Sequence, residues 1–145
     1  MPDQYTPEQY TTVLHRWFEE VWNQGRESTI DELLANGAVA HGLIGPDGQP
    51  VKDVAGFKPF YRHFRAAFPN IRIAIEDTLL DGDKVAARCV VTATHTGPGV
   101  MASPTGKDVS ITGMCIVRVI DGKIVESLNN FDFLSLNKQL GMTLS

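Results

Sequence analysis

The sequence predicts an α+β fold, in which an antiparallel sheet carries helices on one face. Two observations lead to this prediction. Apolar residues recur at helical spacing through the first half of the chain, and apolar and polar residues alternate as in strands from Ile71 onward. Helices that precede strands, rather than alternating with them, are typical of this class. The 145 residues are enough for one domain with a core, and no repeat or linker divides residues 1–145.

The first predicted helix begins at Thr6. A hydroxyl cap there, Pro7 at the first helical position and Gln9 three residues after the cap together form a start signal. Asn23-Gln24-Gly25 ends the helix, and Gly25 suits a left-handed cap. Between these ends lies one broad apolar stripe, made of Val13, Leu14, Trp17, Phe18, Val21 and Trp22.

A second, short helix is predicted around Leu33 and Leu34. Thr29 and Glu32 form its capping box, and Asn36-Gly37 closes it. A short strand is predicted next, followed by a loop rich in Gly and Pro. These two segments are Ala38–Leu43 and Gly45–Pro50.

A third helix opens at Asp53. Its regular part is expected from about Ala55, because Pro59 is tolerated only within about the first helical turn. Phe68-Pro69-Asn70 stops the helix. One of its faces is aromatic and carries Phe57, Phe60, Phe64 and Phe68.

The remaining chain is predicted to be mostly strands, because β-branched residues are frequent and alternate with polar ones. The predicted elements are alternating Ile71, Ile73 and Ile75, a turn at Asp81-Gly82-Asp83, strand Val85–Thr96, loop Gly97–Gly106, strands Val109–Ile120 and Lys123–Phe131, and a helix Leu134–Leu140.

The turn at Asp121-Gly122 decides which side chains of the last hairpin share a face. A three-residue loop with Gly122 in the left-handed position pairs Cys115 with Ser127, whereas a two-residue loop pairs Cys115 with Leu128. We prefer the first register because it collects the apolar residues on one face. That face carries Ile111, Gly113, Cys115, Val117, Val125, Ser127, Asn129 and Phe131, and the other carries Thr112, Met114, Ile116, Arg118, Ile124, Glu126 and Leu128.

Composition excludes several classes of protein. A formal net charge of −4 argues against nucleic acid or an anionic membrane as the main partner. No apolar run approaches the length of a membrane helix, and no secretory signal opens the chain, so we expect a cytoplasmic protein. The four histidines are scattered, and no Cys/His cluster has metal-ligand spacing, so we predict no metal site. For Cys89 and Cys115 free thiols are favoured over a disulfide.

Six segments that follow one another along nearly the whole chain form a recognisable set: WFEEVWNQG, IDELLANGAVAHG, GFKPFYRHFRAAFPNIR, GDKVAARCVVTATHTG, SPTGKDVSITG and IVRVIDGKIVESLNNFDFLSLNKQLG. Taken together, they resemble one enzyme family, the SnoaL-like polyketide cyclases (ester cyclases) of the nuclear transport factor 2-like superfamily. The resemblance implies a curved antiparallel sheet wrapped by helices around a cone-shaped cavity. It also implies a hydrophobic carbonyl or ester substrate, ring closure by an intramolecular aldol step without a cofactor, and a homodimer.

One position departs from the family pattern. The founding members use a carboxylate near the end of the sheet to move protons, and our register places an amide, Asn129, at that position. An amide cannot act as a base, although it can donate hydrogen bonds to an oxyanion. Either the proton-transfer role has moved, with Asp132, His41 and His95 as the candidates, or the family reaction is absent.

Each candidate has a plainer alternative role. Asp132 is either a proton carrier or the N-cap of the last helix. His41 and His95 lie either at the mouth of the pocket or at ordinary surface or core positions, and Asn129 either lines the pocket or is bonded to the backbone. Candidate ligand-contacting residues, several of which are equally expected in the core, are Trp17, Phe18, Trp22, Phe57, Phe60, Phe64, Cys89, Met101, Cys115, Ser127 and Phe131.

The sequence therefore supports two functional hypotheses. The first is a cofactor-free cyclase or isomerase acting by acid–base proton transfer, with Asn129 and Ser127 holding the oxyanion. The second is a non-catalytic binding or assembly module with the same cavity. Epoxide hydrolysis is a weaker third hypothesis, because it requires two acids with an arginine between them and no face supplies that set. The face with Met114, Ile116 and Leu128 is expected to bury against a second copy of the chain.

Overall fold

The computed structural model describes residues 7–99 and 103–142. Its elements in chain order are α1 (Pro7–Arg16), the π-helix η1 (Trp17–Asn23), α2 (Ser28–Leu33), β1 (Leu34–Ile44), β2 (Pro50–Lys52), α3 (Asp53–Ala67), β3 (Arg72–Asp81), β4 (Lys84–Thr94), β5 (Asp108–Ile120), β6 (Lys123–Phe131) and α4 (Phe133–Gln139).

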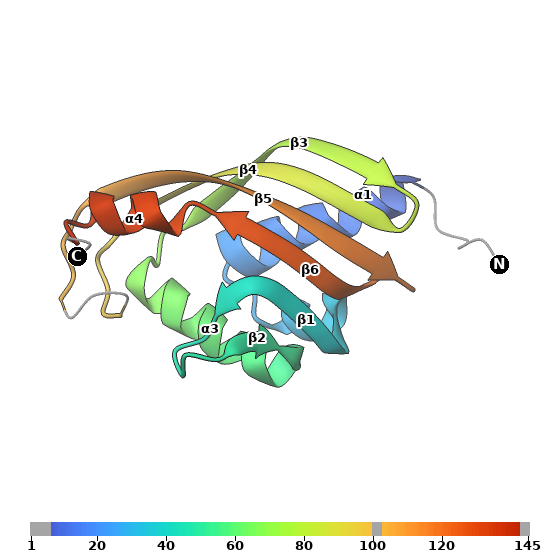
Figure 1. Ribbon diagram of the computed structural model, residues 1–145, viewed down its shortest axis with the longest axis horizontal. Coiled ribbons are helices and arrows are strands. Elements are labelled where there is room, and N and C mark those ends of the chain that lie inside the picture. The colour runs from blue at the N-terminus through green and yellow to red at the C-terminus, as the bar shows by residue number, and fades with distance from the viewer. Residues whose placement is uncertain (1–6, 100–102, 143–145) are drawn as a thin grey trace.

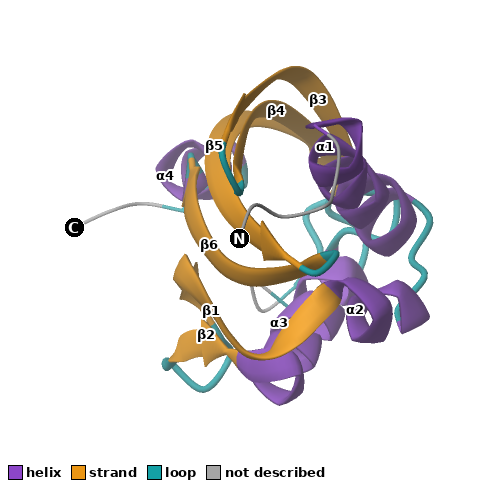
Figure 2. Cartoon of the chain, turned by 90° about the vertical axis from the view of Figure 1, so that its right-hand side faces the viewer, coloured by secondary structure: helices purple, strands orange, loops and turns teal. Residues whose placement is uncertain are grey.

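The six strands form one curved sheet that does not close on itself, with strand order β2-β1-β6-β5-β4-β3 (Figure 1). Helices α1, α2 and α3 lie on the concave side of this sheet (Figure 2). The predicted α+β class is therefore confirmed. No described helix is long and apolar enough to cross a membrane.

One strand pair is parallel, which the expectation of an antiparallel sheet did not include. β1 runs parallel to β6, with Ala40 opposite Ser127 and His41 opposite Leu128. The other four pairings are antiparallel. Parallel neighbours need a long connection, and here most of the chain lies between the two strands.

Burial in β4 and β5 follows the strand period. In β5, buried and exposed residues alternate from Asp108 to Ile120 without interruption. The buried set of β4 includes Val85, Ala87, Cys89, Val91 and Ala93, which the sequence places on one face. These faces pack against the helices and form the sheet side of the core.

The hairpin of β5 and β6 has a different register from the predicted one. Asp121 and Gly122 both have positive φ, 51° and 76°, and form a two-residue turn. The register then shifts by one residue at a bulge, so that Cys115 lies opposite Asn129. The bulge restores the predicted faces for most of the hairpin. Near the turn the prediction was wrong, because Ile124 is buried, at 3% exposure, and lies on the inner face.

The predicted second helix is shorter than expected. Helix α2 ends at Leu33 and β1 begins at the next residue, so Asn36-Gly37 lies within a strand and does not close the helix. Thr29 is inside α2, and its hydroxyl donates to a Glu20 carboxylate oxygen at 3.0 Å instead of capping the helix. The predicted cap Thr6 lies outside the described residues.

Helix α3 begins two residues before Ala55, at Asp53. A carboxylate oxygen of Asp53 accepts hydrogen bonds from the backbone N–H of Gly37 and of Val54, each at 2.9 Å. These bonds hold the pKa of Asp53 below its ordinary value. Pro59 consequently lies in the second turn, where its ring removes one backbone hydrogen bond.

The first helix changes its winding in the middle. The sequence predicts one continuous helix to Asn23, but residues Trp17–Asn23 form a π-helix, and the Gln24 N–H bonds to the Glu19 carbonyl at 2.9 Å, five residues back. Five residues along an α-helix turn a side chain roughly 140° away from its starting direction. A π-helix fits nearly one more residue into each turn. Residues i and i+5 therefore come close to one face, and Trp17 and Trp22 are such a pair.

Candidate ligand-binding cavity

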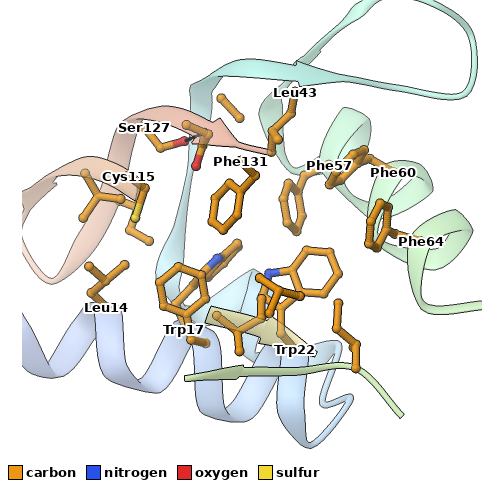
Figure 3. Close-up of a pocket in the computed structure, with 18 of the residues that line it drawn as sticks. Leu14, Trp17, Trp22, Leu43, Phe57, Phe60, Phe64, Cys115, Ser127 and Phe131 are labelled. Carbon is orange, nitrogen blue, oxygen red and sulfur yellow. Dashed lines mark hydrogen bonds between the residues drawn. The ribbon is translucent and has the colours of Figure 1, made fainter. Parts of the chain in front are cut away.

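A cavity lies between the concave face of the sheet and the helices η1 and α3 (Figure 3). About 770 Å³ within it is free of protein atoms, part of this space being open to solvent. Its lining is almost entirely apolar: Leu14, Trp17, Phe18, Trp22, Leu34, Ala40, Leu43, Phe57, Phe60, Phe64, Ile71, Ile73, Val91, Ile111, Cys115, Val117, Ile124, Ser127, Asn129, Phe131 and Phe133.

The sheet wall carries the polar groups of the hairpin. Cys115, Ser127, Asn129 and Phe131 all line the cavity, as the parity of the strands predicted. Phe131 lies opposite Gly113 on β5, and a Cβ atom at Gly113 would come within 2.1 Å of the Phe131 ring. The glycine therefore gives the aromatic ring room to lie across β5.

The Asn129 side chain is fixed by two hydrogen bonds. Its amide nitrogen donates to the backbone carbonyl of His41 and to the Ser127 hydroxyl oxygen, both at 3.0 Å. Because the His41 carbonyl can only accept, the amide orientation is determined, with Nδ2 toward β1. Gly42 makes this contact possible. It has φ +88°, and an added Cβ would lie 2.0 Å from the Asn129 backbone oxygen.

The helix wall is aromatic. Trp17 contacts Phe57 with ring centroids 5.0 Å apart, and Trp22 meets Phe57, Phe60 and Phe64 edge-on at 6.2 to 6.3 Å. Edge-to-face aromatic pairs stabilise each other beyond their burial. The predicted stripe of the first helix and the aromatic face of α3 therefore meet each other at this wall.

Side chains of α3 also satisfy carbonyl groups of the π-helix. The Tyr61 hydroxyl donates to the Val21 carbonyl at 2.8 Å, and the Arg65 guanidinium donates to the Trp22 carbonyl. The Asn23 side chain pairs with the backbone of β3, accepting from the Ile73 N–H at 2.6 Å and donating to the Ile73 carbonyl at 3.0 Å. These hydrogen bonds from α3 and β3 stabilise the π-helical conformation of η1.

The two cysteines differ in position. Cys115 lines the cavity, whereas Cys89 is fully buried and is not among the lining residues, so the structure does not support our expectation that Cys89 contacts a ligand. Both thiols are free. A hydrogen bond with Cys89, together with burial, raises the pKa of Cys115 well above its ordinary value. Cys115 therefore stays a neutral thiol and a poor nucleophile.

His41 lies on the outer face of the sheet, because its side chain is exposed and its ring bonds to a Glu126 carboxylate oxygen at 2.9 Å. The structure does not place it at the cavity wall.

His95 is fully buried but is also not part of the cavity lining. The Thr105 N–H lies 3.1 Å from its Nδ1, and its Nε2 lies 3.2 Å from the Gly99 carbonyl oxygen. Since a backbone N–H can only donate and a carbonyl can only accept, Nδ1 is the acceptor and Nε2 carries the proton. The ring also contacts Phe68 at 5.2 Å. His95 therefore holds Gly99 and Thr105, two residues of the segment between β4 and β5, by hydrogen bonds.

Asp132 caps helix α4. Its carboxylate accepts a hydrogen bond from the Ser135 N–H at 3.0 Å, and the residue is exposed. Its neighbours Phe131 and Phe133 both line the cavity, whereas Asp132 does not. The alternative role that the sequence offered for Asp132, a helix cap, is the one observed.

The structure thus brings nine of the eleven candidate ligand-contacting residues together and leaves the candidate bases elsewhere. Met101 lies outside the described residues. Lining residues that the sequence reading missed include Val91 and Ile111, which the strand parity could have indicated, and Phe133, which follows the cap. Among residues 7–99 and 103–142 no three His, Cys, Asp or Glu side chains are grouped as metal ligands.

The chain is similar to known proteins in both sequence and fold. The family model described as SnoaL-like polyketide cyclase matches residues 12–140. No curated protein matches the chain. Among solved structures, IdmH from Streptomyces antibioticus, provisionally assigned as a polyketide cyclase, is 32% identical with a TM-score of 0.79, and the match covers 92% of this chain and 99% of IdmH.

Two further solved structures are similar to this chain. A provisionally assigned polyketide cyclase from Bacillus cereus ATCC 10987 is 32% identical, with a TM-score of 0.77 and coverage of 94% of this chain and 83% of its own. A provisionally assigned SnoaL-like polyketide cyclase from Jannaschia sp. CCS1 is 20% identical, with a TM-score of 0.81 and coverage of 98% and 99%, and it shows the shared fold. The chain is a member of the SnoaL-like polyketide cyclase family.

Proposed function

We propose that the protein binds a hydrophobic carbonyl compound of polyketide type in the cavity and promotes its ring closure by holding it in a folded conformation. The observation that carries this proposal is the chemistry of the cavity wall. It is built from aromatic and aliphatic side chains, with a few neutral polar groups on β5, β6 and η1. Such a lining suits a polycyclic or poly-ketone ligand, and family membership supports the same substrate class.

The proposed mechanism relies on positioning. Among the described residues that line the cavity, Cys115 alone has a titratable side chain, and its thiol is kept neutral. Proton transfer is therefore left to solvent and to the substrate's own acidic methylene groups. Holding the two reacting carbons of one chain in contact can by itself lower the barrier by several kcal/mol, up to about 7 to 11 kcal/mol in the best intramolecular cases.

A model substrate tests this proposal. An aryl triketone closes by an aldol step between its terminal methyl carbon and its aryl carbonyl, losing one water to give a dihydroxybiphenyl. We expect wild-type protein to accelerate this closure, and Phe131→Ala to reduce the acceleration because the variant loses an aromatic wall. Asp132→Asn and His41→Ala serve as controls and should retain the wild-type rate. Absence of acceleration despite binding contradicts the proposal, and a large rate loss in Asp132→Asn would return the proton-transfer role to Asp132.

A second candidate function is non-catalytic binding of the same ligand class. It is favoured by the amide at Asn129, where the founding members carry an acid, and by the lack of a carboxylate or imidazole among the described lining residues. Intrinsic fluorescence separates the two candidates, because the chain has two tryptophans and both line the cavity. Quenching by the triketone without faster ring closure identifies a binding module.

We also propose that the protein is a homodimer through the outer face of the sheet. Met114, Ile116 and Leu128 on that face are 56%, 43% and 47% exposed, which is high for large apolar side chains. Light scattering should give twice the chain mass, and Leu128→Glu should give the monomer. A monomeric wild-type protein would contradict this proposal.

A further inference from the structure

The two tryptophans of the cavity have indole N–H groups that no described residue accepts from. Trp17 and Trp22 are 8% and 7% exposed, yet neither indole N–H donates a hydrogen bond to a described residue. Every described side-chain nitrogen or oxygen atom that is shielded from solvent has a hydrogen-bond partner. Each indole nitrogen must therefore border accessible space. In Figure 3 both blue nitrogen atoms lie on the cavity side of their rings, below Phe131 and Phe57.

This arrangement depends on the π-helix. In a regular α-helix Trp17 and Trp22 would point in directions roughly 140° apart, and one indole would leave the cavity. The π-helical winding brings them to one wall, and the ring of Phe57 contacts both indoles, at 5.0 and 6.2 Å. Tyr61 and Arg65 hold the carbonyl groups of this segment from α3. The donors are therefore held in place before any ligand arrives.

The opposite wall offers a different polar group. Both N–H groups of the Asn129 amide are occupied, by His41 and Ser127, so the group that Asn129 has left for a ligand is its carbonyl oxygen Oδ1. No described residue donates to this oxygen. The expectation that Asn129 donates to an oxyanion therefore does not fit the geometry, because an amide oxygen can only accept.

We infer that Trp17 and Trp22 form a two-donor site for a carbonyl oxygen of the ligand, and that Asn129 accepts from a ligand hydroxyl on the opposite wall. The ligand class is an aromatic or polycyclic hydroxy ketone, bound with its carbonyl toward η1 and its hydroxyl toward β6. Two neutral N–H donors stabilise a carbonyl oxygen, and they stabilise it more strongly as negative charge develops during enolisation. This inference rests on the proposed function and assigns the polar contacts between the ligand and the cavity.

An NMR experiment on the wild-type protein tests the donor site directly. The chain contains two tryptophans, so a proton–nitrogen correlation spectrum of the isotope-labelled protein shows two indole signals, which Trp17→Phe assigns. The ligands are acetylnaphthalene and ethylnaphthalene of the same substitution pattern, which differ in the carbonyl oxygen. We expect the ketone to move the indole proton signals downfield, as hydrogen bonding does. The hydrocarbon should bind without that shift.

Binding constants provide the second measurement. Trp17→Phe and Trp22→Phe keep an aromatic ring but remove the N–H group, and each should weaken acetylnaphthalene about fivefold more than ethylnaphthalene. Equal weakening of both ligands, or an indole spectrum that responds alike to both, overturns the inference and leaves the proposed function standing. If neither ligand binds, the proposed function fails as well.

A hydroxylated probe tests the acceptor. Adding a hydroxyl group to acetylnaphthalene should tighten binding about fivefold relative to its methoxy analogue. Asn129→Leu should remove this preference while leaving the preference of the ketone over the hydrocarbon intact. Persistence of the hydroxyl preference in Asn129→Leu contradicts the role assigned to Asn129.

Discussion

The hydroxyl of Tyr61 lets us predict how much the π-helix depends on its neighbours. Tyr61 is 3% exposed, and its hydroxyl donates to the Val21 carbonyl at 2.8 Å. Burial raises the pKa of Tyr61, so the group remains a protonated donor. Tyr61→Phe keeps the ring and its contact with Trp22, at 5.2 Å between centroids, and deletes only this bond.

The expected loss has two parts. A net hydrogen bond contributes about 1 kcal/mol to folding, and a buried carbonyl left without its donor adds to the cost, for a total of about 1 to 2 kcal/mol. For a chain of this length that corresponds to roughly 3 to 8 °C in Tm.

Urea and thermal unfolding followed by circular dichroism measure this loss. Thr12→Val is the matched control, because it also deletes one hydroxyl without changing shape, but from an exposed site where the hydroxyl bonds to the Glu8 carbonyl at 2.6 Å. The control should change stability by less than about 0.5 kcal/mol. If Tyr61→Phe is as stable as Thr12→Val, the bond to the Val21 carbonyl does not support the π-helix.

Three further predictions concern other sites. Asp132→Ala should cost about 1 kcal/mol through loss of the α4 cap, seen as a lower urea midpoint, while Asp132→Asn, which keeps a capping side chain, should be nearly neutral. Gly42→Ala should cost about 2 kcal/mol or more and weaken ligand binding, because the new Cβ meets the Asn129 carbonyl in a left-handed backbone; wild-type stability would contradict this close approach of β1 to β6. A hydrogen bond from Arg16 lowers the pKa of Glu20 from 4.5 to about 2. The contribution of ionised Glu20 to the free energy of unfolding is therefore complete above about pH 4.5 and is lost as the pH falls toward 2. After allowing for solvent screening, this contribution is about 1 kcal/mol. Glu20→Gln should remove that part of the acid sensitivity of the urea midpoint, and an unchanged pH profile would refute the assignment.

The sequence predicted the order of the longer helices and strands and most inward residues of the last hairpin, because periodicity is a local property of the chain. It missed the short strand β2, whose first residue, Pro50, was assigned to a loop. The exact pairing was missed. The turn has two residues, and the bulge that follows it restores the parity. A turn and a bulge of this kind compensate each other, so both registers place Cys115, Ser127 and Asn129 on the same face and differ only near the turn, as at Ile124. Composition alone therefore cannot choose between them.

The π-helix could not be predicted for a different reason. The stripe from Val13 to Trp22 matches α-helical spacing well, and the change in winding is stabilised by Tyr61 and Arg65, which are about forty residues away. The positions of His41 and His95 depend on contacts with other segments, with Glu126 for His41 and with Phe68 and Thr105 for His95. Sequence reasoning therefore found the aromatic wall but misjudged which polar groups belong to the cavity.

The parallel pairing of β1 with β6 has a consequence for how the chain folds. The bond from Asn129 to the His41 carbonyl joins residues 88 positions apart, and β1 and β2 reach the rest of the sheet through this pairing. During synthesis β1 and β2 can pair with each other, but they cannot join the rest of the sheet until β6, near the end of the chain, has been made. Contacts of such high sequence separation slow folding, because the long loop has to close first. We expect truncation before β6 to leave β1 and β2 unprotected in hydrogen exchange, even where the β3–β4–β5 meander is retained.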